Sequence, residues 1–171
     1  MKEFIWRSFQ ASGKKHLFLT GSKGIGKTTV LREILEQGIE YGGIVTRVIR
    51  EDGRMPNYIL LQDINNDSLS TIVGSRNEEG SGIIPCLAGF EGYGVAILQS
   101  YLSKPLRWII LDEIGYLESD ASYFKEAVRS CLREKQVIAV LRKDANPFLE
   151  EIISCPDALL IDLDGLVKVG L

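Results

Sequence analysis

The sequence contains few of the residues that build metal centres and disulfide frameworks. His16 is the only histidine among 171 residues, and the three cysteines, Cys86, Cys131 and Cys155, are far apart and form no C-x-x-C pair. Their odd number and wide spacing exclude a disulfide scaffold and argue against structural zinc, because both need closely spaced sulfur ligands. We therefore expect reduced thiols, which are typical of a cytoplasmic protein.

Charge of one sign and long hydrophobic runs are also scarce. The net charge is −3, which does not favour nucleic acid as a partner. The longest apolar run, from Leu106 to Leu111, is interrupted by Arg107 and is far shorter than the ~20 residues of a membrane-spanning helix. The N-terminal apolar block is too short for a signal peptide. A chain that is 45% hydrophobic and 25% charged is typical of a globular protein, and its length predicts one domain over residues 1–171.

Apolar runs and glycine positions predict alternating strands and helices. Strands are expected over 16–20, 43–49, 58–62, 107–112, 137–141 and 158–163, and helices over 27–37, 90–102, 121–133 and 147–153. The Asp52-Gly53 pair predicts an antiparallel hairpin over 43–62, whereas residues 63–89 are glycine-rich and predict loop, with a short strand at 69–73. The expected class is α/β: an open, mostly parallel sheet with helices on both faces and an antiparallel edge hairpin.

The strongest motif lies between the first predicted strand and the first predicted helix. Residues 21–28 read Gly-Ser-Lys-Gly-Ile-Gly-Lys-Thr and match G-x-x-x-x-G-K-[ST], the Walker A motif or P-loop. The glycines let backbone N–H groups turn toward phosphate oxygens, and the helix adds the positive end of its dipole. Lys27 is expected to bind the β- and γ-phosphates and Thr28 to bind Mg²⁺. The predicted phosphate-binding residues are Gly21, Ser22, Lys23, Gly24, Ile25, Gly26, Lys27, Thr28 and Thr29.

A second motif is the apolar strand that ends in Asp112-Glu113. A strand ending in aspartate after a P-loop is a Walker B motif, in which Asp112 holds the metal shell. Glu113, one residue further on, is placed to polarise an attacking water, which is general-base chemistry for hydrolysis. Alone, such an acid pair is a weak signal that is more typical of a turn, but the P-loop upstream favours the catalytic interpretation.

The two motifs and their surroundings resemble the THEP1 family of small nucleoside triphosphatases. The resemblance covers residues 15–165 and rests on 21–29 (GSKGIGKTT), 42–46 (GGIVT), 112–118 (DEIGYLE) and the 137–147 stretch with Arg142 and Asp144. It implies hydrolysis of ATP, GTP and other nucleoside triphosphates with Mg²⁺, on a P-loop NTPase fold of the additional-strand, catalytic-glutamate type. The chain departs from the family pattern at Arg47-Val48, where acidic residues are usual, and in its N-terminal extension, residues 1–14.

Several side chains have two interpretations each. Arg142 follows a predicted strand directly and is our first choice for an arginine finger on the γ-phosphate, with Arg50 as the second. Phe90 and Tyr93 could stack on a base, although core packing is favoured. Trp6 and Phe9, in the N-terminal extension, either fold back over the sheet or contact a protein partner.

We therefore predict a Mg²⁺-dependent nucleoside triphosphatase with broad base tolerance, since no guanine-reading N-K-x-D motif is present. The predicted catalytic residues are Lys27, Glu113 and Arg142, and the metal ligands are Thr28 and Asp112. Two alternatives remain. One is a small nucleotide or metabolite kinase, against which residues 74–89 count, because a lid there would supply only Arg76. The other is a nucleotide-gated switch with slow hydrolysis.

Overall fold

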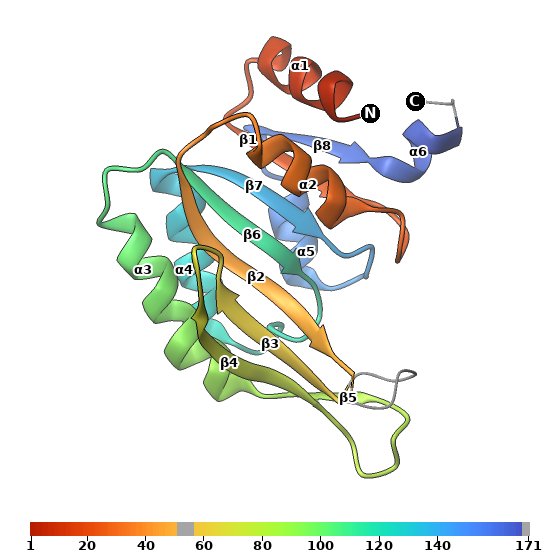
Figure 1. The fold of residues 1–171 in the computed structure, drawn as a ribbon, viewed down its shortest axis with the longest axis vertical. Helices are drawn as coiled ribbons and strands as arrows, with labels where there is room; N and C mark the ends of the chain where they lie inside the picture. Colours follow the sequence, from red (N-terminus) through yellow and green to blue (C-terminus); the bar gives the residue numbers. More distant parts are fainter. Residues whose placement is uncertain (51–56, 169–171) are drawn as a thin grey trace.

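The computed structural model describes residues 1–50 and 57–168. Within them, eight strands form one sheet in the order β5-β4-β3-β2-β6-β7-β1-β8, with helices on both faces (Figure 1). The strands are β1 (His16–Thr20), β2 (Tyr41–Ile49), β3 (Tyr58–Asp63), β4 (Asn66–Arg76), β5 (Ile83–Pro85), β6 (Trp108–Ile114), β7 (Gln136–Leu141) and β8 (Ala158–Asp162). The helices are α1 (Lys2–Ser12), α2 (Lys27–Leu35), the π-helix η1 (Gly89–Gly94), α3 (Val95–Leu102), α4 (Ser122–Glu134), α5 (Pro147–Ile153) and α6 (Leu163–Lys168).

Five strands make the parallel part of the sheet. β2, β6, β7, β1 and β8 pair in parallel, so their carboxyl ends share one edge. β7 lies between β1, which leads into the glycine loop, and β6, which ends in the two acids. This inserted strand is the additional strand that the resemblance implies. The predicted α/β class with a mostly parallel sheet is confirmed, and ligands of such sheets bind at the shared carboxyl edge.

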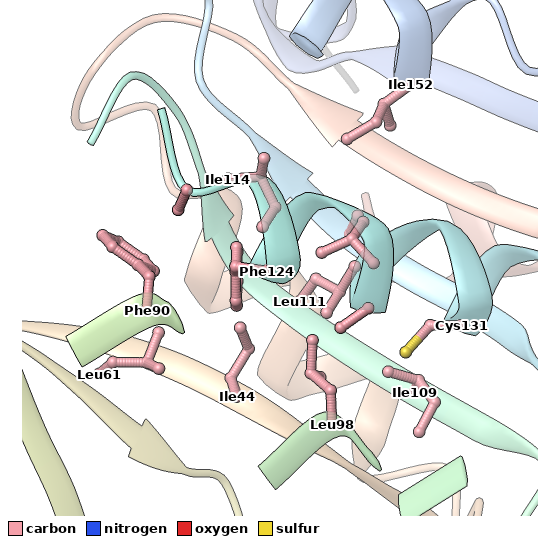
Figure 2. Close-up of a cluster of buried hydrophobic side chains, with 14 of the residues drawn as sticks. Ile44, Leu61, Phe90, Leu98, Ile109, Leu111, Ile114, Phe124, Cys131 and Ile152 are labelled. Atoms are coloured by element: carbon pink, nitrogen blue, oxygen red, sulfur yellow. The ribbon is translucent and has the colours of Figure 1, made fainter. Parts of the chain in front are cut away.

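Alternation along the central strands divides the core in two. Leu17 and Leu19 face α1 and α2, whereas Phe18 between them faces α3, α4 and α5. Ile109 and Leu111 lie on the second face with Phe18, and Figure 2 shows Leu111 near Phe124 and Ile109 near Cys131. Because successive side chains of a strand point to opposite faces, a fully apolar strand needs helices on both sides. This is why the central strands read as unbroken hydrophobic runs.

The antiparallel part of the sheet is larger than the sequence predicts. The β2–β3 hairpin pairs as expected, from Ile44 opposite Asp63 to Ile49 opposite Tyr58; its Asp52-Gly53 turn lies outside the described residues. The short strand expected at 69–73 is present as part of β4, which spans 66–76 and pairs with β3. The prediction of loop over the rest of 63–89 was wrong where β4 extends beyond 69–73 and where β5 pairs with β4. The full length of β4 was missed because its first residues are polar and exposed, so they show no apolar run; the β3 backbone supplies the pairing instead.

The N-terminal extension folds onto the molecule as α1. Ile5 and Phe9, one helical turn apart, are buried, and Gly13 ends the helix in the left-handed conformation with φ 68°. The rings of Trp6 and Phe9 lie 5.9 and 5.8 Å from that of Trp108, between ring centroids. The interpretation that these aromatic residues fold back over the sheet is confirmed. A protein partner at residues 1–14 stays a prediction.

Two aromatic residues and the histidine considered in the sequence lie in or against the same core. Phe90 is buried and packs against Phe124 (Figure 2), with ring centroids 5.0 Å apart. Tyr93 is partly buried against the same cluster. Phe90 therefore packs in the core rather than against a base. His16 is buried, and its Nδ1 accepts the Val137 N–H at 3.1 Å; burial lowers the pKa of the imidazole to about 4. Among the described residues, no helix is both long and apolar enough to cross a membrane.

Candidate active site

The loop between β1 and α2 turns on three glycines. Gly21, Gly24 and Gly26 have φ of 143°, 82° and 99°, values that residues with a Cβ rarely adopt. Gly21 is also crowded, because a Cβ there would lie 3.0 Å from the Ile25 side chain and 3.5 Å from that of Leu163. Ile25 packs against the apolar cluster under α1 and α2. The glycines thus let the loop turn tightly into the N-terminus of α2, where the positive end of the helix dipole lies.

Lys27, the first residue of α2, folds its side chain back over this loop. Its Nζ donates to the carbonyl oxygens of Gly21 at 2.9 Å and Ser22 at 3.1 Å, and only 9% of the residue is exposed. The same Nζ lies 4.0 Å from Oε1 of Glu113. A cation fixed at the mouth of the loop attracts phosphate oxygens.

Thr28 and Asp112 bring two oxygen ligands together at the end of β6. The Thr28 hydroxyl donates to Oδ1 of Asp112 at 3.1 Å. Asp112 is 3% exposed, and burial raises the pKa of its carboxyl to about 6, an effect that Thr28, Arg32 and Lys27 reduce. A buried carboxylate beside a hydroxyl is a hard-oxygen pair of the kind that Mg²⁺ prefers. Among the described residues no group of three or more acidic, histidine or cysteine side chains that could hold a metal ion is found.

Glu113 lies between two cations. Its Oε1 is 4.0 Å from Nζ of Lys27 and 4.0 Å from Nε of Arg142, and its side chain is 34% exposed toward the cleft. Its backbone N–H donates to the hydroxyl of Thr46 at 3.3 Å. Thr46 belongs to the GGIVT stretch, for which the sequence predicted no role; its contact with Glu113 across β2 and β6 becomes visible only in the sheet.

Arg142 leaves β7 beside Glu113. Its guanidinium lies 5.1 Å above the ring of Tyr116, and its Nε is 3.2 Å from Oδ2 of Asp144. Gly115 makes room for it, since a Cβ at that position would lie 2.4 Å from Cδ of Arg142. The space beside Gly115 is therefore filled by the arginine side chain, and any larger residue at 115 would displace it.

A buried carboxylate supports the turn that carries Glu113. Glu118 is 2% exposed and accepts the backbone N–H of Gly115. The carbonyl of Gly115 accepts Nδ2 of Asn146 at 3.0 Å, which ties this turn to the loop after β7. Burial raises the pKa of Glu118 to about 7; the hydrogen bond from Gly115 lowers it and the nearby Glu113 charge raises it. The sequence showed Glu118 only as part of a matching motif.

The segment after β8 holds the other side of the glycine loop. Oδ2 of Asp164 accepts both the backbone N–H and the hydroxyl of Ser22, at 3.0 and 2.9 Å. Lys143 donates to the carboxylates of Asp162 at 2.8 Å and Asp164 at 2.9 Å, and its hydrogen bond helps to lower the pKa of Asp164. Sequence reasoning missed α6 and Asp164, because a six-residue helix after a strand shows no periodicity to detect.

One cleft joins these parts, with a volume of about 880 Å³. It brings together the glycine loop, Lys27, Thr28, Thr29, Glu113 and Arg142, and Arg50 also lines it. Two of the predicted residues do not line it: Ile25, which packs inward, and Asp112, which contacts the cleft through Thr28.

Comparison with known proteins decides the family to which this site belongs. A family model described as NTPase matches residues 16–165. The chain belongs to this NTPase family. Its curated relatives include nucleoside-triphosphatase THEP1 of Thermotoga sp. (strain RQ2), 32% identical over 152 residues that cover 86% of each chain. The THEP1 of Methanocaldococcus jannaschii is 28% identical over 142 residues, covering 79% of this chain and 83% of that one.

Solved structures agree with this NTPase in fold. The crystal structure of THEP1 from Aquifex aeolicus superposes with a TM-score of 0.69 at 24% identity, over 91% of this chain and 96% of that one. The solution structure of a human cancer-related nucleoside triphosphatase gives 0.67 at 23% identity, over 90% and 96%. The resemblance to the THEP1 family, seen first in the motifs, is therefore confirmed.

Proposed function

We propose that this NTPase hydrolyses nucleoside triphosphates to nucleoside diphosphate and phosphate with Mg²⁺ and with little preference for the base. The observation that carries the proposal is the position of Glu113, whose Oε1 lies 4.0 Å from both Lys27 Nζ and Arg142 Nε in the cleft that the glycine loop lines. A carboxylate held between two cations beside a phosphate loop is suited to orient a water against a phosphoryl group.

Each role follows from one contact in the cleft. The loop N–H groups and Lys27 bind the phosphates, because both present positive charge to the same space. Thr28 and Asp112 would hold Mg²⁺, which when bound neutralises developing charge on the phosphates. Glu113 accepts the proton of the attacking water. Arg142 is the arginine finger in preference to Arg50, because its Nε lies next to Glu113.

A cytoplasmic location is part of the same proposal. It is supported by Cys86, Cys131 and Cys155, all three of which are free thiols in the structure.

The test is phosphate release from ATP and GTP, with Mg²⁺ and with excess chelator. We expect Mg²⁺-dependent release from both, with kcat/KM values that differ by less than ~2 kcal/mol in activation free energy, the scale of weak pocket discrimination. Lys27→Ala should abolish nucleotide binding in calorimetry and turnover together while the circular dichroism stays that of the parent. Lys2→Ala, on the far helix α1, is the matched control and should behave as the parent. Equal activity with chelator, or a thousandfold preference for one base, would refute the proposal.

A further inference from the structure

The cleft extends well beyond the phosphate loop. Its far part, here called the distal cleft, is lined by Val48, Arg50, Ile59, Ser81, Gly82, Ile83 and Tyr116. The order of the strands in the sheet shows where the distal cleft lies relative to the phosphate loop. β1 and its glycine loop lie on one side of β6, and β2, β3, β4 and β5 lie on the other. Glu113, just past Asp112 on β6, therefore stands between the phosphate loop and the distal cleft.

The last residues of β2 extend beyond the end of β6 at the shared carboxyl edge of the sheet. Val45 lies opposite Asp112 in the parallel pairing of β2 with β6. Val48 and Arg50 come after Val45 in the chain, so they lie further toward the carboxyl edge of the sheet than Glu113 of β6 does. A ligand in the distal cleft would accordingly meet Glu113 from the side opposite the phosphate loop.

The floor of the distal cleft is continuous and apolar. Val48 lies directly opposite Ile59 in the β2–β3 ladder. At Gly74 of β4 a Cβ would lie 2.8 Å from the Ile83 side chain and 3.5 Å from that of Ile59, so the missing side chain lets Ile59 and Ile83 approach each other. Val48 is 43% exposed although its neighbours are apolar. Such a surface binds an apolar body.

The charge on the described residues that line the distal cleft is positive. Among the described residues that line it, Arg50 alone is charged, and it is exposed. Tyr116 forms one wall of the distal cleft and is 38% exposed. The Arg142 guanidinium lies over its ring, 5.1 Å from the ring centroid. An apolar floor with arginines at its rim selects a small molecule that has an apolar body and an acidic group.

We propose that the distal cleft binds a second substrate, a small amphipathic anion with a hydroxyl group that accepts the γ-phosphoryl group in place of water. This inference rests on the proposed function, because it uses the same phosphate site. The hydroxyl oxygen forms a bond to the γ-phosphorus, and the bond from that phosphorus to the β–γ bridging oxygen breaks, its electron pair leaving on the nucleoside diphosphate. The hydroxyl proton passes to the carboxylate of Glu113. Residues 74–89, first considered as a lid, supply part of the pocket wall instead.

Binding is tested with anilinonaphthalene sulfonate, whose fused rings and sulfonate match the floor and the arginines. The dye is titrated into protein saturated with Mg²⁺ and a non-hydrolysable ATP analogue. We expect saturable binding that Val48→Asp weakens by ~10-fold or more, since it sets a charge against an apolar and anionic ligand. Leu69→Asp on β4 is the matched control, because Leu69 is 42% exposed and does not line the cleft; it should bind as the parent does. Dye that binds Val48→Asp as well as the parent, or that the ATP analogue displaces, overturns the distal site.

Transfer is tested with ATP labelled in its γ-phosphate and a deproteinised small-molecule extract of cells. The parent should form labelled organic phosphate, and Val48→Asp should lower the ratio of organic to inorganic labelled phosphate by ~10-fold or more, whereas Leu69→Asp keeps the parent ratio. If the parent releases inorganic phosphate but forms no labelled organic phosphate, the acceptor proposal fails and the hydrolase stands. If it releases no phosphate without the extract, the proposed function itself fails.

Discussion

At the scale of single residues, the two neighbouring acids at the end of β6 have different surroundings. Asp112 is buried and accepts the Thr28 hydroxyl, whereas Glu113 reaches the cleft between Lys27 and Arg142. The register of β6 against β7 shifts between Asp112 and Ile114, and at this irregular end of the strand the two acids meet different neighbours. The sequence pattern shows both acids, but only the fold shows which of them faces the cleft.

Glu113→Gln should separate binding from hydrolysis. The amide keeps the shape of the side chain but cannot take a proton, so turnover should fall by ~10²–10⁴ while the nucleotide still binds. Asp112→Asn should instead weaken Mg²⁺-nucleotide binding and turnover together, because it removes a charge next to Thr28. Calorimetry and phosphate release on both variants check this. Wild-type turnover in Glu113→Gln would mean that another group positions the water.

Glu118 should leave a signature in the pH dependence of stability. Its folded carboxyl keeps a proton up to about pH 7, well above its ordinary pKa of 4.5, because it is buried. The folded state thus binds more protons than the unfolded state across that window, so its stabilising contribution is present at low pH and is lost as the pH rises. From pH 5 to pH 8 the parent should lose about 2–3 kcal/mol of unfolding free energy relative to Glu118→Gln.

Urea denaturation of both proteins at several pH values in that range measures the difference. The titration of Asp112 is common to both proteins and cancels in the comparison. Parallel pH profiles for the two proteins would show that Glu118 titrates in its ordinary range.

At the scale of elements, α1 shows how the structure decides between two interpretations of one segment. Its apolar residues were read either as a partner-binding stripe or as a cover for the sheet, and Ile5 and Phe9 prove to be buried. The helix was not predicted as such, because eleven residues with two buried positions give a weak periodic signal.

Phe9→Ala should therefore destabilise the whole protein. Phe9 is 5% exposed and packs against Trp6 and Trp108, so its truncation should cost ~3–5 kcal/mol of unfolding free energy. Phe4→Ala on the same helix is the control; Phe4 is 45% exposed and its loss should change stability by less than ~0.5 kcal/mol. Denaturant unfolding measures both. A Phe9→Ala protein as stable as the parent would mean that α1 is not part of the folding unit.

At the scale of the whole molecule, the sheet order creates the site. β7 separates β1 from β6 and brings Arg142 to within 4.0 Å of Glu113, while the antiparallel strands β3, β4 and β5 extend the cleft on the far side of Glu113. Strand order is a property of long-range pairing, so residues far apart in sequence such as Lys27, Glu113 and Arg142 meet only when the sheet is assembled.

The sequence by itself determined the parts that depend on local chemistry. The strand over 16–20 and the helix over 147–153 were predicted with their observed bounds, because a short apolar run ending at glycine and a proline at the start of a helix are local signals. The P-loop and the acid pair were visible for the same reason. Tertiary structure alone decided the rest. β4 forms because β3 offers its backbone, and Asp164 reaches Ser22 because β8 lies beside β1. Glu118 is buried in a turn whose Gly115 lies against Arg142 from another strand end, and no pattern along the chain encodes such a contact.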